Sequence, residues 1–204
     1  FVAALIALSA ALTRVMMTWS IIDTPNSRSS HQRPTPRTGG IAIAITCLCG
    51  WIMVYLLMPE RDIFFRIAPL EFGIYVAIAI GVFLLSLVDD IWGLQPLVKF
   101  LIQIIAALLF VLFVATFREL SIPGIGVVQL TIWGSVLAVL WIVFFMNAFN
   151  FMDGINGLAG GVALIACLCL AVIGTFKGAH LVTLTSLCLA ASNAGFLRYN
   201  FSSG

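Results

Sequence analysis

Two adjacent carboxylates, Asp89 and Asp90, end an apolar run, and Lys99 follows nine residues after Asp90. Like charges this close repel each other, so they need a cation, a shared proton or water. Mg²⁺ is commonly held by one or two carboxylates together with substrate phosphates. Alternatively, one carboxylate could act as a general base, or the pair could be a solvated helix end. Lys99 could be a point charge on a diphosphate or could extend to the membrane interface, with Gln103 one turn further along as a packing or hydrogen-bonding partner.

The stretch Asn147–Gly161 is unusually polar for its position between two apolar runs. Its polar side chains recur at every third residue: Asn147, Asn150, Asp153 and Asn156. This spacing keeps them roughly on one side of a helix or tight turn, where oxygens could bind a hard cation and amide N–H groups a nucleotide. Glycines such as Gly154 allow a ligand to approach the backbone closely. Helix packing could explain Gly157 and Gly161, but not the polar residues.

A third polar segment connects the first two apolar runs. Its basic side chains are Arg28, His31, Arg33 and Arg37. Such a segment attracts anionic lipid headgroups. The usual enrichment of Lys and Arg in cytoplasmic loops would give the same pattern. Acidic groups for a metal, cations for phosphates and an Asn/Gly stretch for a nucleotide together predict phosphoryl transfer between a nucleotide substrate and a lipid phosphate.

The elements that must position these residues are membrane spans. The chain of 204 residues is 62% hydrophobic and only 9% charged, whereas soluble proteins carry about 25% charged residues. We therefore expect an all-α polytopic membrane protein, with residues 1–204 forming one membrane domain in a lipid bilayer and with no nucleic-acid partner. Runs of about 20 apolar residues predict about seven spans, at 1–21, 41–58, 71–88, 97–117, 130–148, 159–175 and 179–197.

Alternation of these spans puts all three polar segments on one side of the membrane. That side carries six Lys and Arg residues: Arg14, Arg28, Arg33, Arg37, Lys99 and Arg198. The other side carries four: Arg61, Arg66, Arg118 and Lys177. Because Lys and Arg are enriched on the cytoplasmic side, this small excess predicts that the polar segments face the cytoplasm.

The same segments resemble a known family. The resemblance rests on Pro34-Thr-Pro-Arg-Thr-Gly-Gly40, Val88-Asp-Asp-Ile-Trp-Gly-Leu94 with Lys99, Asn147–Gly161, and Gly195-Phe-Leu-Arg-Tyr-Asn200. Their order and spacing are similar to those of the polyprenyl-phosphate N-acetylhexosamine-1-phosphate transferases, glycosyltransferase family four. Asp23-Thr-Pro-Asn-Ser-Arg-Ser-Ser-His31 looks most like the branch that initiates O-antigen synthesis.

This resemblance implies a reaction and a location. A sugar-1-phosphate moves from a UDP-N-acetylhexosamine to undecaprenyl phosphate with release of UMP, and the reaction requires Mg²⁺, or Mn²⁺ in its place. The product would initiate O-antigen or another cell-envelope polysaccharide. The expected location is the bacterial inner membrane with a cytoplasmic active face, and a homodimer is a candidate assembly.

The resemblance also implies roles for individual residues. Asp89 and Asp90 would flank the reacting phosphates, with Asp89 activating the lipid phosphate and Lys99 facing the diphosphate. The implied metal ligands are Asp90, Asn150 and Asp153. The substrate-binding residues would be Asn147, Asn150, Asp153, Gly154 and Asn156, with Arg28, His31, Arg33 and Arg37 from the basic segment. Many members carry Asp where this chain has Asn156, which leaves its contact open.

One further departure from the family and two alternative functions remain. The family normally continues after Asn200 with a patch that carries a main metal ligand, a later sugar-recognition loop and further spans, so we expect these residues to be the N-terminal part of the transferase. The rival is a polytopic transporter with an ion or substrate site at Asn147–Gly161, and a catalytically inactive scaffold is a third option. One-step transfer and a covalent phospho-enzyme both fit these residues, and the sugar stays open.

Overall fold

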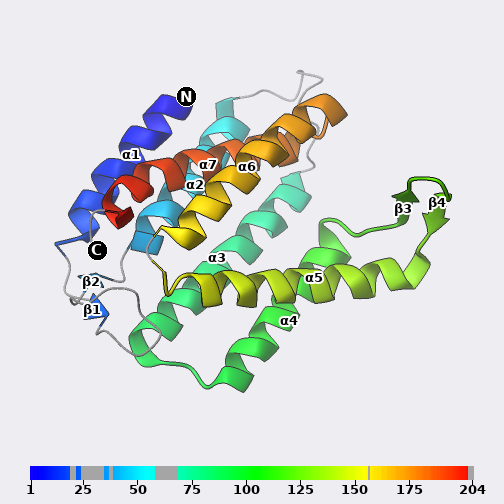
Figure 1. Cartoon of the computed structure of the whole chain (residues 1–204), viewed down its shortest axis with the longest axis horizontal. Coiled ribbons are helices and arrows are strands. Elements are labelled where there is room, and N and C mark those ends of the chain that lie inside the picture. The colour runs from blue at the N-terminus through cyan, green and yellow to red at the C-terminus, as the bar shows by residue number, and fades with distance from the viewer. Residues whose placement is uncertain (19–21, 24–34, 37–38, 58–68, 156, 202–204) are drawn as a thin grey trace. The chain divides into compact units, whose positions relative to one another are not determined.

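The computed structural model describes residues 1–18, 22–23, 35–36, 39–57, 69–155 and 157–201 (Figure 1). The chain divides into two compact units. The terminal unit consists of Phe1–Ile67 and Asn150–Gly204, and the central unit of Ala68–Phe149. The prediction that residues 1–204 form a single membrane domain stays a prediction.

Helices dominate both units. In chain order they are α1 (Val2–Met16), α2 (Gly39–Leu57), α3 (Pro69–Trp92), α4 (Pro96–Phe113), α5 (Thr131–Met152), α6 (Leu158–Lys177) and α7 (His180–Asn200). The helices α2 to α7 are each long and apolar enough to cross a membrane. The predicted all-α polytopic fold is therefore confirmed, and each predicted span overlaps one helix.

The first predicted span differs most from the structure. It was expected at 1–21, but α1 ends at Met16 and has 15 residues, fewer than the roughly 20 that cross a bilayer. Residues 19–21 of that prediction lie outside the described part of the chain. In the first connection, the two-residue strands β1 (Ile22–Asp23) and β2 (Thr35–Pro36) pair antiparallel; the sequence had not indicated them.

Helix α7 lies at the centre of the terminal unit. It packs against α1, α2 and α6 (Figure 1), and half of its most apolar segment is buried within the protein. Its buried residues are mostly small, including Ser186, Ala190, Ala191 and Ser192. Small residues let helices approach closely in a membrane, where no hydrophobic effect drives them together. This explains why α7, the least apolar of the six described helices that could cross a membrane, is also the most enclosed.

The approach between α1 and α7 is especially close at Gly195. A Cβ atom at this position would lie 2.5 Å from the backbone oxygen of Ile6 and 2.7 Å from the Cβ of Ser9. Nearby, the buried Ser9 hydroxyl donates a 2.6 Å hydrogen bond to the backbone oxygen of Ser192. Gly195 therefore lets the backbones of α1 and α7 approach closely, and the Ser9 hydroxyl links the two helices by a hydrogen bond to a backbone oxygen.

The central unit begins with two packed helices, α3 and α4, joined by the short connection Gly93–Gln95. Gly93 has φ of +64°, a left-handed conformation that glycine adopts without strain and that commonly ends helices. Its N–H donates to the backbone oxygen of Asp89. Pro96 is the first residue of α4, where its fixed φ suits a helix and its missing N–H costs nothing. The local sequence therefore turns the chain sharply between the two helices.

A β-hairpin that the sequence reading missed precedes α5. Strands β3 (Glu119–Ile122) and β4 (Gly126–Gln129) pair antiparallel, with Glu119 opposite Gln129. The Gln129 amide donates a 2.8 Å hydrogen bond to the Glu119 carboxylate. Gly124 in the turn and Gly126 at the start of β4 both have positive φ, which is typical of tight hairpin connections.

Candidate functional site

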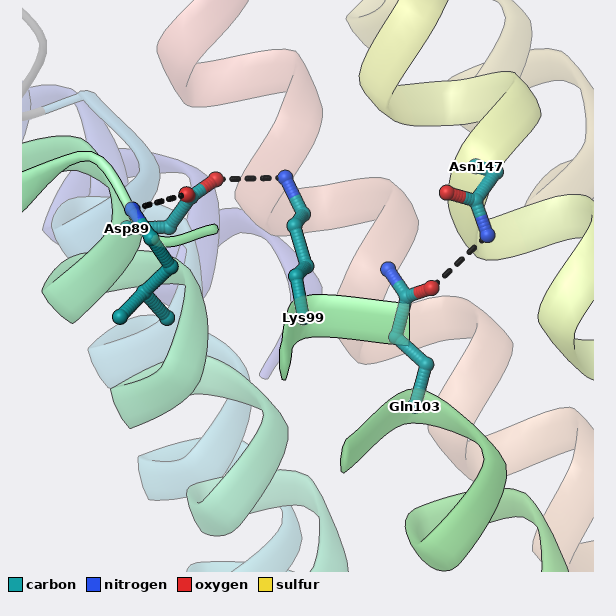
Figure 2. Close-up of polar contacts among 5 residues, drawn as sticks. Asp89, Lys99, Gln103 and Asn147 are labelled. Atoms are coloured by element: carbon teal, nitrogen blue, oxygen red, sulfur yellow. Dashed lines mark hydrogen bonds and ion pairs between the residues drawn. The ribbon is translucent and has the colours of Figure 1, made fainter. Parts of the chain in front are cut away.

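Asp89 is held by both the turn and the helix that follow it. One carboxylate oxygen accepts a 3.1 Å hydrogen bond from the Leu94 N–H, and the other forms a 2.5 Å ion pair with Lys99 Nζ (Figure 2). Lys99 lies in the first turn of α4, which begins at Pro96. The side chains of Lys99 and Asp89 are 17% and 21% exposed, so the pair is reachable from outside. The sharp turn thus brings together two charges that the sequence separates by ten positions.

Asp90 is in a different position from its neighbour. It lies in the same last turns of α3 but is exposed, whereas Asp89 is half-buried. Successive side chains on a helix point about 100° apart, so the two carboxylates face different directions. The structure therefore gives the two carboxylates different surroundings: Asp89 is half-buried and paired with Lys99, and Asp90 is exposed.

A second polar connection joins α4 to α5. Gln103, one turn after Lys99, is 3% exposed. Its Oε1 accepts a 2.8 Å hydrogen bond from the Asn147 amide nitrogen (Figure 2). The same nitrogen donates a 2.8 Å hydrogen bond to the backbone oxygen of Val143. Both amide hydrogens of Asn147 are therefore used within the protein, and its oxygen is the atom left for a ligand.

The segment after Asn147 leaves the helix within the predicted site. Asn150 is in the last turn of α5, which ends at Met152, and Asp153 and Gly154 form a turn. Both Asn150 and Asp153 are exposed. The three-residue spacing therefore continues through a helix end and a turn, which brings backbone groups as well as side chains to the surface.

Gly157 anchors the end of this turn. It has φ of +75° and starts α6 as its N-cap. Its N–H donates a 2.5 Å hydrogen bond to the side-chain oxygen of Asn200, at the end of α7. A Cβ on Gly157 would lie 2.1 Å from a ring carbon of Phe201. Glycine is required here by both conformation and space.

The sequence reading assigned no role to Asn200 or to the Leu94 N–H, and named Gln103 only as a partner. Asn200 belongs to the Gly195–Asn200 motif that carries part of the family resemblance, but the motif does not indicate which group Asn200 contacts. The backbone N–H of Leu94 carries no side-chain signal at all. Its contribution depends on the turn at Gly93, which is a feature of the three-dimensional structure.

The predicted site residues are distributed over the two units. The central unit holds Asp89, Asp90, Lys99 and Asn147, and the terminal unit holds Asn150, Asp153 and Gly154. The remaining predictions, Arg28, His31, Arg33, Arg37 and Asn156, lie outside the described residues. Their roles stay predictions, as do all the assigned catalytic and binding roles.

The predicted metal ligands have suitable chemistry. Asp90 and Asp153 offer carboxylate oxygens and Asn150 an amide oxygen, which are the ligands that Mg²⁺ prefers. Within the described ranges, no group of three or more His, Cys, Asp or Glu side chains is gathered to hold a metal ion. Mg²⁺ usually keeps several waters and binds substrate phosphates through one or two carboxylates, so such a group is not a requirement. The donor atoms of these residues are suitable for Mg²⁺, and the metal site stays a prediction.

The fold is that of a polytopic membrane protein, and its central unit carries the Asp89–Lys99 ion pair and the Gln103–Asn147 hydrogen bond. Residues 72–204 match the family model for glycosyl transferase family 4. The chain therefore belongs to this family, and the resemblance inferred from its motifs is confirmed at that level. Membership in a transferase family favours an enzyme over the transporter alternative.

Several relatives share most of this chain. A probable undecaprenyl-phosphate N-acetylglucosaminyl 1-phosphate transferase of Bacillus subtilis is 33% identical over 189 residues, which are 92% of this chain and 50% of the relative. A decaprenyl-phosphate N-acetylglucosaminephosphotransferase of Mycolicibacterium smegmatis is 34% identical over 190 residues, covering 87% and 46%. A phospho-N-acetylmuramoyl-pentapeptide-transferase of Lactiplantibacillus plantarum is 39% identical over 111 residues, covering 53% and 35%.

The chain spans about half the length of the first of these relatives. No solved structure matches it.

Proposed function

We propose that the protein transfers an N-acetylhexosamine-1-phosphate from a UDP-sugar to a polyprenyl phosphate and releases UMP. The observation that carries the proposal is the Asp89–Lys99 ion pair, in a chain that belongs to glycosyl transferase family 4. The names of the relatives from Bacillus subtilis and Mycolicibacterium smegmatis support a polyprenyl-phosphate acceptor and an N-acetylglucosamine-1-phosphate group. Undecaprenyl phosphate is the acceptor we propose, and initiation of O-antigen or another envelope polysaccharide is the proposed role.

In the proposed reaction, an oxygen of the polyprenyl phosphate attacks the phosphorus that carries the sugar, and the bond to the UMP phosphate breaks. Lys99 Nζ has three donors, so it can bind a diphosphate oxygen while it stays near Asp89. As Lys99 turns toward the diphosphate, the Asp89 carboxylate becomes available to accept the acidic proton of the lipid phosphate. Mg²⁺, when bound near Asp90, Asn150 and Asp153, would offset negative charge on the phosphate oxygens.

The arrangement of Asp89 supports its role as the proton acceptor. Two donors, the Leu94 N–H and Lys99 Nζ, each bind one of its carboxylate oxygens and so fix the orientation of the group. A carboxylate that is already oriented needs little rearrangement when the acceptor arrives. If Asp89 instead attacked the donor itself, a covalent phospho-enzyme would form, and labelled sugar-phosphate would remain on the denatured protein.

We further propose a bacterial inner-membrane location with the site on the cytoplasmic side. This orientation rests on the excess of six basic residues over four and on the cytoplasmic supply of nucleotide sugars. Labelling of single cysteines introduced at Gln95 and at Pro123, with a reagent that does not cross the membrane, would test it. Cysteine at Pro123 should react in intact spheroplasts, whereas cysteine at Gln95 should react only after the membrane is opened; the reverse pattern would invert the orientation.

The activity itself is tested with membranes that contain the full gene product. UDP-N-acetylglucosamine and undecaprenyl phosphate with Mg²⁺ should yield UMP and a lipid-linked sugar, and omission of the lipid phosphate or chelation of the metal should stop both. Parallel assays with other UDP-N-acetylhexosamines would identify the sugar. Absence of UMP release with every donor, from protein that is present and folded, would reject the proposed function.

A further inference from the structure

Gln103 is a buried amide whose orientation can be deduced from the hydrogen bonds around it. The backbone oxygen of Val143 can only accept, so the Asn147 atom that faces it at 2.8 Å must be the amide nitrogen. That same nitrogen lies 2.8 Å from Gln103, so the facing Gln103 atom must be its oxygen. Amide orientations are normally ambiguous, but here a backbone carbonyl settles both.

Because its oxygen faces Asn147, the side-chain nitrogen of Gln103 points away from Asn147. Figure 2 shows Nε2 on the side of the amide nearer Lys99. Within the described part of the chain, Asn147 is the one hydrogen-bond partner of Gln103. The residue as a whole is 3% exposed. Its Nε2 keeps access from outside, because among the described residues it is not one of the fully enclosed side-chain atoms that lack a hydrogen-bond partner. An unpaired donor in a largely buried residue costs about 1–3 kcal/mol, so we expect Nε2 to donate to water or to a ligand.

The position of Gln103 indicates which acceptor this is. Lys99 precedes it by four residues on α4, so the two side chains lie on one face of the helix. A cation and an amide N–H₂ group on one helix face favour an anion rich in oxygen. We propose that Gln103 Nε2 donates hydrogen bonds to a phosphate oxygen of a substrate that also contacts Lys99. This inference rests on the proposed function for the identity of that substrate.

Two substrates carry such oxygens, the diphosphate of the UDP-sugar and the phosphate of the polyprenyl acceptor. Measuring the KM of each substrate separately in Gln103 variants shows which of the two Gln103 contacts. Gln103→Glu keeps an oxygen for Asn147 but replaces the donors with an acceptor, so it should raise the KM of the contacted substrate tenfold or more, as expected for loss of a hydrogen bond to a charged group. The KM of the other substrate should change less than twofold.

A second variant guards against a folding defect. Gln103→Met has a similar size and no hydrogen-bonding groups, so it should raise the same KM without introducing a charge. Gln129→Glu is the matched control, because it makes the same chemical change at an exposed position of the β3–β4 hairpin. It should leave both KM values as in the wild type.

Binding of UDP and uridine provides a readout that a merely structural role would not change. If Gln103 contacts a donor phosphate, both Gln103 variants should weaken the thermal shift that UDP produces and leave the shift with uridine as it is. Unchanged KM values for both substrates in folded Gln103→Glu and Gln103→Met protein would overturn the inference and leave water as the acceptor. A wild-type protein without transferase activity would reject the proposed function instead, and the UDP and uridine measurements would still test Gln103.

Discussion

Asn147 and Asn193 have the same side chain and the same local hydrogen bond but serve different purposes. Each donates from its amide nitrogen to the backbone oxygen four residues earlier, Val143 and Leu189 respectively, at 2.8 Å. Asn193 is buried in α7, at 4% exposure. Asn147 is exposed and also reaches a second helix through Gln103. The hydrogen bond within the helix orients each amide. The contact with a second helix, through Gln103, distinguishes Asn147 from Asn193.

The same contrast distinguishes the two units. In the terminal unit, several buried hydroxyls donate to backbone oxygens, as Ser9 does to Ser192 and Ser192 does to Cys188. Such bonds are complete within the protein and hold helices together. In the central unit, Asp89 pairs with Lys99, and both side chains are partly exposed. Charged and amide groups that remain reachable can exchange their partners for a substrate, whereas satisfied hydroxyls at a helix crossing cannot.

The largest expected effect that tests this contrast comes from Asp89. Asp89→Asn removes the negative charge and the proton acceptor while keeping the shape, so UMP release should fall by about a thousandfold. The measurement is the initial rate in membranes with equal amounts of protein. Activity within tenfold of the wild type would show that Asp89 does not accept the proton and that its ion pair with Lys99 is structural.

The next effect concerns the cation. Lys99→Met keeps the stem of the side chain but removes the charge that faces Asp89, so kcat/KM should fall by about a hundredfold, as for loss of a preorganised donor. Lys99→Arg keeps the charge with a planar geometry and should recover part of this loss. Equal loss in both variants would indicate that geometry, not charge, is required at this position.

The terminal unit should respond in stability instead. Gly195→Ala places a Cβ 2.5 Å from the Ile6 oxygen, and such overpacking costs about 1–3 kcal/mol. The midpoint of thermal unfolding in detergent should fall. Gly81→Ala is the control, because a Cβ there meets nothing within 4 Å and alanine favours the helix in both cases. A Gly195→Ala protein as stable as the Gly81→Ala control would show that α1 and α7 can separate at no cost.

The smallest effect compares the two asparagines directly. Asn147→Ala and Asn193→Ala should lower stability by similar amounts, about 0.6 kcal/mol for one polar interaction between membrane helices. Activity should fall only in Asn147→Ala, by about fivefold, which corresponds to the ~1 kcal/mol of one hydrogen bond. Equal activities, normalised to folded protein, would remove the functional distinction between them.

Much of the fold was predictable because hydropathy is a local property. Apolar runs placed every helix, and Pro96 and Gly93 marked the turn between α3 and α4. The prediction was weakest where local signals are short. The β3–β4 hairpin has strands of only four residues, and α1 ends before its apolar run does.

Sequence by itself determined the class of protein, the family and the residues that could do chemistry. An apolar run of about 20 residues becomes a helix in lipid because no other local structure satisfies its backbone, and polar residues at membrane depth are costly enough to indicate a site. Only the tertiary structure decided the partners. Gln103 and Asn147 are 44 positions apart, and Gly157 and Asn200 are 43 apart. Such pairs depend on how helices pack, so no local pattern could predict that the Gln103 amide would be oriented by Val143 through Asn147.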